Sequence, residues 1–268
     1  MRIVDNILVD DPRIKPFVPA TRGWIKSITI RPEFLAYHYT ATTSLADALA
    51  SKWAVHFYID WDGSIIQKVP LDKYACHAGV SEWGGRVNLN AFAHGIEIVN
   101  YGFLYRDWKG RYYRDGKYIA AENVMEKPHR LEKKYKYWQI FTPAALQSVK
   151  DVSECMNNHY HYIDAVGHED VCAKVDPGPA FPTEVFREYL YGPEVIQRYI
   201  VSRWWSGNDI GAGGVSLKWQ PWDWSPSLVW CPAGTVVRKL EWNGRWVKVE
   251  RDDGRKGWIR EKYLRRIV

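Results

Sequence analysis

The sequence predicts an α/β domain, with a mixed sheet and flanking helices, followed by a small all-β barrel. In residues 1–190, segments that alternate apolar with polar residues are mixed with segments of three- and four-residue apolar spacing, as expected for strands among helices. Glycines then crowd residues 207–214, the most flexible composition in the chain. Beyond them, Asn243-Gly244 and Asp253-Gly254 are hairpin signals about ten residues apart, which favour a meander or barrel.

Five strands are expected in the first part. Val55–Asp60 and Ser64–Val69 flank the turn Asp62-Gly63 and predict a hairpin. Further strands are predicted at Phe34–His38, Gly95–Val99 and Ile163–Gly167. The Tyr-, Lys- and Arg-rich stretch Phe103–Tyr137 is expected to form a surface excursion that carries a hairpin around Asp115-Gly116.

Three helices are expected around these strands. Thr142-Pro143 has the form of a helix cap followed by proline at the first helical position, and apolar residues then recur at three- and four-residue steps: Leu146, Val149, Val152 and Met156. Shorter helices are predicted to begin at Ser44 and at Thr183. Their inward residues would be Leu45, Leu49 and Trp53 in the first, and Val185, Phe186, Tyr189 and Leu190 in the second.

The tail contains three β-type segments, at Thr235–Leu240, Arg245–Glu250 and Lys256–Arg260. Nine of the fifteen tryptophans lie between Trp204 and Trp258, more than so small a core can bury. We therefore expect some of them to be exposed for stacking on a ligand.

Composition excludes several classes of protein. Of 268 residues, 46% are hydrophobic and 25% charged, enough apolar surface to offset chain entropy and exclude wholesale disorder. No apolar run approaches the ~18 residues of a bilayer span, so we expect no integral membrane segment. Asp5 and Asp10-Asp11 stand where a secretory signal needs an apolar stretch, so we expect synthesis to end in the cytoplasm. The four cysteines lack a C-x-x-C pair and are expected to be free thiols.

The net charge of +6 is concentrated in the tail. Residues 201–268 hold 13 Lys/Arg against 7 Asp/Glu, whereas residues 1–200 hold 24 of each kind. The tail's basic residues alternate with acids and tryptophans and form no run of Lys/Arg. An anionic or sugar-rich polymer therefore fits the tail as well as DNA does.

Two histidines and an aspartate stand out as candidates for chemistry. His38 ends one expected strand and His168 follows another, so both imidazoles emerge at strand ends, where sites are assembled. Asp176 lies eight residues past His168 and opens the stiff segment Asp176–Pro179. Two imidazoles and a carboxylate, with a fourth position open, are the ligand set of a catalytic zinc. On spacing alone, structural histidines and a turn-capping aspartate are the competing interpretation.

Glu97 and Lys174 are further candidates. Glu97 lies inside a strand apolar enough to be covered on both faces, where desolvation raises a carboxyl pKa toward the range useful for proton transfer. The alternative for Glu97 is a buried ion pair with Lys or Arg. Lys174, two residues before Asp176, is placed to stabilise an oxyanion, with a solvated lysine as the alternative.

Five ordered blocks between about residues 30 and 190 resemble the type 2 N-acetylmuramoyl-L-alanine amidases. The blocks are Tyr37–Ala41, His56–Ile65, Cys76–Gly79, Gly95–Asn100, and Gly167–Asp170 together with Asp176–Phe181. The resemblance implies a zinc hydrolase that cuts the amide bond between the lactyl group of N-acetylmuramic acid and L-alanine of the peptidoglycan stem peptide. The family includes muropeptide-recycling amidases, short phage amidases and animal peptidoglycan recognition proteins.

The resemblance also implies roles for single residues. His38, His168 and Asp176 map to the Zn²⁺ ligands, Glu97 to the general base and then acid, and Lys174 to the oxyanion stabiliser. Substrate contacts would come from His77, Arg86 and Asn90, with Arg86 suited to a stem-peptide carboxylate and ordinary loop structure as the alternative for all three.

The sequence departs from the family pattern in one loop. The segment from His168 to Asp176 is about two residues shorter than the pattern and contains Cys172. Some relatives use cysteine as the third ligand, but the Asp-Pro-Gly-Pro context favours Asp176. The shortening puts the reach of Lys174 in doubt.

The tail resembles a bacterial SH3-like domain through Pro232–Val237, Trp246–Val249 and Gly254–Ile259, followed by Tyr263-Leu264. In wall hydrolases such modules hold the enzyme on peptidoglycan and raise the local substrate concentration. We expect a zinc amidase domain at 1–190, a linker at 191–214 and an SH3-like cell-wall-binding domain at 215–268. A packing module that binds nothing is the alternative for the tail.

Together these observations predict a two-module peptidoglycan amidase that acts as a phage or prophage endolysin. We expect a monomer that binds peptidoglycan and no nucleic acid, and that stays in the cytoplasm until it is released to the wall by a holin-type lesion. A cytosolic muropeptide-recycling amidase is the alternative that the tail disfavours. A non-catalytic peptidoglycan-recognition protein is disfavoured by the three ligands with Glu97 and Lys174.

Overall fold

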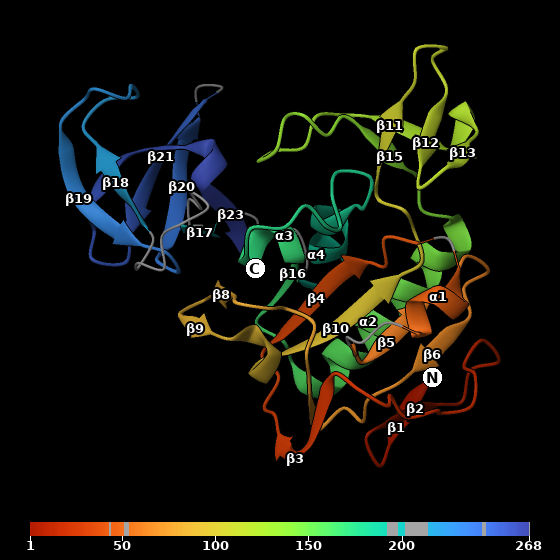
Figure 1. The fold of residues 1–268 in the computed structure, drawn as a ribbon. Helices are drawn as coiled ribbons and strands as arrows, with labels where there is room; N and C mark the ends of the chain where they lie inside the picture. Colours follow the sequence, from red (N-terminus) through yellow and green to blue (C-terminus); the bar gives the residue numbers. More distant parts are fainter. Residues whose placement is uncertain (43, 51–53, 192–197, 202–213, 243–244, 268) are drawn as a thin grey trace.

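A mixed five-stranded sheet forms the centre of the computed structural model, which describes residues 1–42, 44–50, 54–191, 198–201, 214–242 and 245–267. The strand order is β16 (Asp164–Gly167), β4 (Phe34–Tyr39), β10 (Ala93–Ile98), β5 (Phe57–Ile59) and β6 (Ile65–Gln67) (Figure 1). The first four strands are parallel, and β6 returns antiparallel to β5. All five expected strands are confirmed. Because parallel strands end at the same edge, residues at the ends of β16, β4 and β10 lie together.

The long helix α2 (Pro143–Tyr160) covers one face of this sheet. The Thr142 side chain accepts a hydrogen bond from the Ala145 backbone at 3.1 Å, with proline at the first helical position, as the sequence predicted. Its buried residues Val149, Val152 and Met156 pack in the main core. On the opposite face, the short helix α1 (Leu45–Leu49), capped by Ser44, packs with Ala48 near Tyr58 and Ile66. Trp53, also expected to point inward from this helix, lies outside the described residues.

The helix α4 (Thr183–Tyr191) begins where predicted, and two of its four predicted inward residues face the core: Phe186 is buried and Leu190 packs partly buried against it. Val185 and Tyr189, expected to point inward, are 63% and 42% exposed. The buried residues are Phe186 and Arg187, because Arg187 forms an ion pair with Asp164 of β16. The prediction for Val185 and Tyr189 was therefore wrong. A further short helix, α3 (His168–Val171), follows β16 directly.

Short elements complete the first part of the chain. Three two-stranded ribbons pair β1 (Arg2–Val4) with β2 (Ile7–Val9), β3 (Trp24–Thr29) with β7 (Lys73–Ala75), and β8 (Glu82–Trp83) with β9 (Arg86–Val87), and a 3₁₀ turn, η1, spans Leu89–Ala91. All four cysteines are free, as expected. Among the helices that the structure describes, none is both long and apolar enough to cross a membrane.

The excursion between β10 and α2 is a second sheet, which we call the insertion sheet. Its strands are β11 (Phe103–Arg106), β12 (Tyr112–Arg114), β13 (Lys117–Ile119), β14 (Val124–Glu126) and β15 (Tyr137–Gln139), with the 3₁₀ turn η2 at Ala121–Asn123. The predicted hairpin around Asp115-Gly116 is confirmed, but the five strands of this sheet were not predicted. At the base, the Asn100 amide donates to the carbonyls of Gln139 and Ile140 at 3.4 Å, and Tyr101 N donates to Gln139 Oε1 at 2.8 Å.

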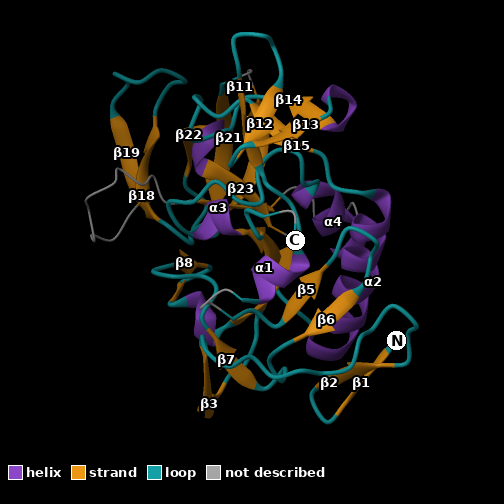
Figure 2. Ribbon diagram, turned by 45° about the vertical axis from the view of Figure 1, so that its right-hand side comes forward, coloured by secondary structure: helices purple, strands orange, loops and turns teal. Residues whose placement is uncertain are grey.

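The tail forms a seven-stranded antiparallel sheet almost free of helix (Figure 2). Its strands are β17 (Arg198–Val201), β18 (Gly214–Lys218), β19 (Ser227–Pro232), β20 (Val236–Trp242), β21 (Trp246–Arg251), β22 (Lys256–Arg260) and β23 (Leu264–Ile267), and a 3₁₀ turn, η4, spans Glu261–Tyr263. The three predicted strands correspond to β20, β21 and β22. The predicted linker, 191–214, mostly lies outside the described residues, as does Asn243-Gly244, but 198–201 pair with β20 and β23.

Candidate metal and catalytic site

The alternation of side chains along two neighbouring strands brings His38 and Glu97 to the same face. The two residues are register partners in β4 and β10. Their neighbours Tyr37, Ile96 and Ile98 belong to the core under α2. Because successive strand side chains point to opposite faces, His38 and Glu97 point away from α2.

His168 and Asp176 join this face from the next strand. His168 directly follows β16, and Asp176 returns on the loop after α3, where the Glu169 backbone N–H donates to the Asp176 carbonyl at 2.7 Å. Asp176 Oδ2 lies 3.1 Å from His38 Nδ1 and 2.9 Å from His168 Nδ1. One ligand atom from each of the three residues lies within 4.8 Å of the others. The structure therefore brings the three predicted metal ligands together.

The other ring nitrogens of the two histidines are held by the chain. His168 Nε2 lies 3.3 Å from the Ala78 carbonyl, which only accepts, so this nitrogen carries a proton. His77 Nε2 likewise donates to the Ala93 carbonyl at 3.1 Å, so its Nδ1 accepts from His38 Nε2 at 3.2 Å. In their neutral forms, both His38 and His168 therefore turn Nδ1 lone pairs toward one carboxylate oxygen.

This arrangement fits a metal ion. The Nδ1 lone pairs and the carboxylate oxygen that they face at about 3 Å repel each other unless a proton or a cation lies between them. Two neutral imidazoles and a carboxylate are a zinc donor set, and histidine ligands commonly donate their second N–H to a backbone or side-chain acceptor. Cys172 is outside this group among the described residues, and its Sγ lies 3.6 Å from the His168 carbonyl oxygen. The choice of Asp176 over Cys172 agrees with this geometry.

Charges inside the group shift its pKa values in opposite directions. Burial, and then the nearby charge of His168, lowers the pKa of His38 to about 4. Burial alone would raise the pKa of Asp176, but the two imidazoles hold it well below its ordinary value. Burial opposes protonation of His168, yet the Asp176 carboxylate raises the pKa of that ring well above its ordinary value. A buried carboxylate thus attracts positive charge at this point.

Glu97 is the one carboxylate of the site that has an orphaned atom. Its Oε2 is buried and has no hydrogen-bond partner in the part of the chain that the structure describes. Burial, and then the charge of Asp176, raises the pKa of Glu97 to about 8. The alternative of a buried ion pair with Lys or Arg is not found among the described residues. A carboxyl group with such a pKa is suited to accepting and returning a proton near neutral pH.

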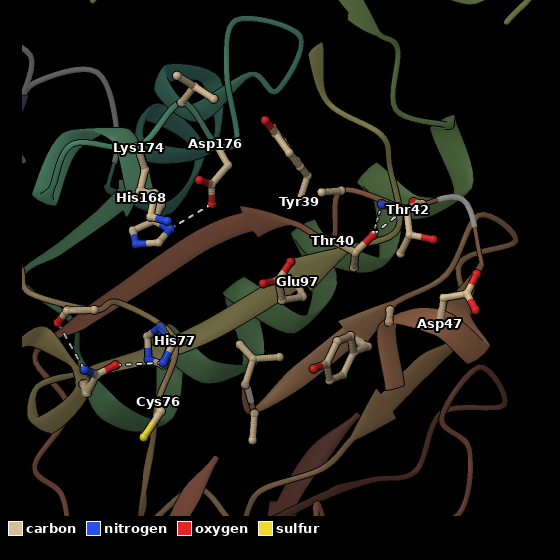
Figure 3. Close-up of a pocket in the computed structure, with 18 of the residues that line it drawn as sticks. Tyr39, Thr40, Thr42, Asp47, Cys76, His77, Glu97, His168, Lys174 and Asp176 are labelled. Atoms are coloured by element: carbon tan, nitrogen blue, oxygen red, sulfur yellow. Dashed lines mark hydrogen bonds and ion pairs between the residues drawn. The ribbon is translucent and has the colours of Figure 1, made fainter. Parts of the chain in front are cut away.

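Glu97, His168 and Asp176 line a cavity of about 890 Å³ (Figure 3). Lys174, His77 and Asn90 line the same cavity, so the shorter loop still brings Lys174 to it. Asn90 Oδ1 accepts hydrogen bonds from the backbones of His77 at 2.8 Å and Ala78 at 2.7 Å, which fixes the loop carrying His77. With both ring nitrogens engaged, His77 orients His38.

Arg86, the third predicted substrate contact, is absent from the residues that line the cavity. It lies on the β9 strand and binds both carboxylate oxygens of Glu33, at 2.7 to 3.1 Å. Conversely, Tyr39, Tyr58 and Arg114 line the cavity, although the sequence analysis did not select them. Arg114 comes from the insertion sheet, whose position over the site has no local signal in the sequence.

The family of the chain follows from comparison with known proteins. Residues 29–179 match the N-acetylmuramoyl-L-alanine amidase family, and the chain belongs to it. The 1,6-anhydro-N-acetylmuramyl-L-alanine amidase AmpD of Escherichia coli is 32% identical over 136 residues, which cover 50% of this chain and 56% of AmpD. The amidase AmiD of E. coli is 29% identical over 176 residues, 60% of this chain and 54% of AmiD.

A solved structure is also similar. The complex of E. coli AmiD with anhydro-N-acetylmuramic acid-L-Ala-D-γ-Glu-L-Lys has 25% sequence identity and a TM-score of 0.47, covering 63% of this chain and 61% of the AmiD chain. The present chain spans about half the length of the curated relatives it matches.

Proposed function

We propose that the protein hydrolyses the amide bond between N-acetylmuramic acid and L-alanine of peptidoglycan. The observation that carries this proposal is the orphaned, buried Glu97 carboxyl beside the His38–His168–Asp176 group, in a cavity large enough for a sugar and several amino acids. Membership of the amidase family supports the type of bond, and the activities for which AmpD and AmiD are named support the muramyl-peptide substrate.

His38, His168 and Asp176 would hold a zinc ion, which when bound supplies Lewis acidity to the amide carbonyl and to a water molecule. Glu97 takes a proton from the attacking water as the water oxygen bonds to the carbonyl carbon, and then gives that proton to the leaving nitrogen of L-alanine as the C–N bond breaks. Lys174, at the cavity wall, stabilises the negative charge that develops on the carbonyl oxygen. His77 keeps the His38 ring oriented throughout.

The test measures release of new L-alanine amino groups from purified peptidoglycan, with the zinc content of each protein determined by mass spectrometry. We expect about one zinc per wild-type chain, loss of zinc and activity in His168→Ala, and loss of activity with zinc retained in Glu97→Gln. Exposed His159 on α2 and exposed Glu122 give the matched controls His159→Ala and Glu122→Gln. Binding of wall material by wild type without new amines would refute the proposal and favour a non-catalytic recognition protein.

We further propose that 1–190 form the catalytic domain and 215–268 an SH3-like domain that binds the cell wall, with the linker expected at 191–214 interrupted by β17, which belongs to the sheet of the tail. The tail exposes Trp219, Trp224 and Trp230, at 63%, 84% and 53%, whereas Trp246 and Trp258 are 8% exposed. Exposed indole rings together with the tail's net positive charge suit a polymer of sugars and carboxylates. Loss of sacculus binding in a Trp219→Ala, Trp224→Ala variant, but not in Val185→Ala, would support this role.

A wall-binding tail favours an endolysin, a monomer held in the cytoplasm until release. The names of the AmpD relatives favour the second candidate, a muropeptide-recycling amidase. The ratio of kcat/KM for intact sacculi to that for a soluble anhydro-muropeptide separates the two. A high ratio supports the endolysin, and a rate confined to the soluble substrate supports the recycling enzyme.

A further inference from the structure

The insertion sheet concentrates positive charge on an otherwise acidic part of the chain. Between Phe103 and Tyr137 there are 10 Lys/Arg against 5 Asp/Glu, whereas the remainder of residues 1–200 has 14 against 19. The same 35 residues contain eight aromatic side chains. This sheet therefore differs in charge and in composition from the domain that carries it.

A second cavity, of about 660 Å³, lies at the end of β11. The connection from β11 to β12 forms one wall, and Lys134 and Tyr137 form another. Two aromatic residues of this cavity are unusually open to solvent, Trp108 at 88% and Tyr105 at 50%. Large apolar rings exposed beside a cavity indicate a surface that a ligand covers.

The cations of this second cavity are not neutralised by its own acid. The Asp107 carboxylate accepts hydrogen bonds from the backbones of Lys109 and Arg111 and from Arg111 Nε, each at 2.9 Å. These bonds stabilise the 107–111 turn. Lys109 lies 4.8 Å from the Trp108 ring and has no ion pair among the described residues. Lys134 has an exposed pairing with Glu132 at 3.6 Å, which is weak in water. The cavity thus offers aromatic faces with adjoining positive charge.

A single short strand joins this cavity to the active-site cavity. β12 begins at Tyr112, just after the 107–111 turn, and ends at Arg114, which lines the active-site cavity. Three strand residues span roughly 7 Å from first to last Cα. The guanidinium of Arg114 lies 4.0 Å from the Phe103 ring centre, so a cation and an aromatic ring also lie together between the two cavities.

We propose that this second cavity binds the peptidoglycan polymer beyond the unit that is cut, with Trp108 and Tyr105 against a sugar ring and Lys109 beside a stem-peptide carboxylate. The proposal rests on the proposed amidase function. A second contact on the same polymer raises the effective concentration of the scissile bond at Glu97. A soluble muramyl tripeptide has a single sugar ring, which lies at the scissile bond, so it offers no second sugar to Trp108 and Tyr105, and the contact discriminates polymer from fragment.

The test compares wild type with Trp108→Ala, Lys109→Gln and the double variant. Exposed Lys117, on the same sheet but outside the cavity, gives the matched control Lys117→Gln. Initial rates are measured on sacculi stripped of teichoic acids and on a soluble muramyl tripeptide. Cosedimentation with the same sacculi is measured in a Glu97→Gln background.

We expect the double variant to lose about tenfold in rate at low sacculus concentration and in sacculus affinity, with the rate on the tripeptide within about twofold of wild type. Lys117→Gln should match wild type on both substrates. Unchanged sacculus binding and rate in the double variant, or equal losses on both substrates, would overturn the proposal. Wild type that cuts neither substrate refutes the amidase function, and an affinity loss confined to the Trp108 and Lys109 variants would then still support the binding site.

Discussion

The orphaned carboxyl of Glu97 should destabilise the metal-free fold at neutral pH. Burial raises the pKa of Glu97 from 4.5 to about 8, so at pH 7 the folded protein holds this group protonated whereas the unfolded chain releases the proton. A raised folded pKa contributes stability that is fully present below pH 4.5 and is lost as the pH rises through 8. In the Glu97→Gln variant the side chain is neutral at every pH, so this variant does not lose stability in the same way as the pH rises.

The magnitude follows from the pKa difference. Each pH unit above 4.5 lowers the free energy of unfolding of wild type by about 1.4 kcal/mol until the folded pKa is reached. Glu97→Gln should therefore be more stable than wild type by up to about 3 kcal/mol at pH 7. Water in the cavity screens the carboxyl, which makes this figure an upper bound. The difference should vanish near pH 4 and level off above pH 8.

Urea unfolding of both proteins in chelator, at intervals from pH 4 to pH 8.5, measures the difference directly. Groups common to both proteins cancel, so the pH dependence of the difference reports Glu97 alone. A difference that is flat across this range, or a variant less stable at pH 7, would refute the account of Glu97. Added zinc should shrink the difference, because a nearby cation favours the ionised carboxylate.

Three further predictions address the surroundings of the site. His77→Ala should lower zinc affinity by about 10- to 100-fold in a chelator competition, because the His38 ring loses its orienting partner, and unchanged affinity would contradict that role. Arg187→Met should lower the free energy of unfolding by about 3–5 kcal/mol, since it leaves Asp164 buried and unpaired, and adding Asp164→Asn should restore part of it. Arg86→Gln should keep the rate on a soluble muramyl peptide within about twofold of wild type, and a large rise in KM would return Arg86 to the substrate contacts.

The site residues that could be predicted from the sequence are those that lie at or near the ends of strands. His38, Glu97 and His168 are each placed by a strand with a clear apolar pattern, and parallel pairing alone then brings them to one edge. Asp176 follows within a loop that proline and glycine restrict. Local pattern and global topology agree at these positions, and so prediction succeeded there.

Contacts with partners distant in the sequence leave no local pattern. Arg86 binds Glu33, 53 residues earlier, and does not line the cavity, so its role as a substrate contact stays a prediction. The inward face of α4 is decided by the ion pair of Arg187 with Asp164, whereas apolar spacing favoured Val185. The strands of the insertion sheet, such as Phe103–Arg106 and Tyr112–Arg114, place apolar and aromatic residues side by side instead of alternating them with polar residues, so they lacked the usual period-two signal.

The closed base of the insertion sheet has a consequence for how this protein can change. The chain leaves β10 and re-enters before α2 at a single place, where the Asn100 amide donates to the Gln139 carbonyl and the Gln139 side chain accepts from the Tyr101 backbone N–H. The returning part of the segment is tied to the site, because His129 binds Glu169 and Arg130 binds Asp170, next to His168. The turn at 107–111, by contrast, can be lengthened or replaced without displacing the strands that carry His38 and Glu97. Exchanging this turn should therefore change polymer preference while leaving the proposed hydrolytic step intact.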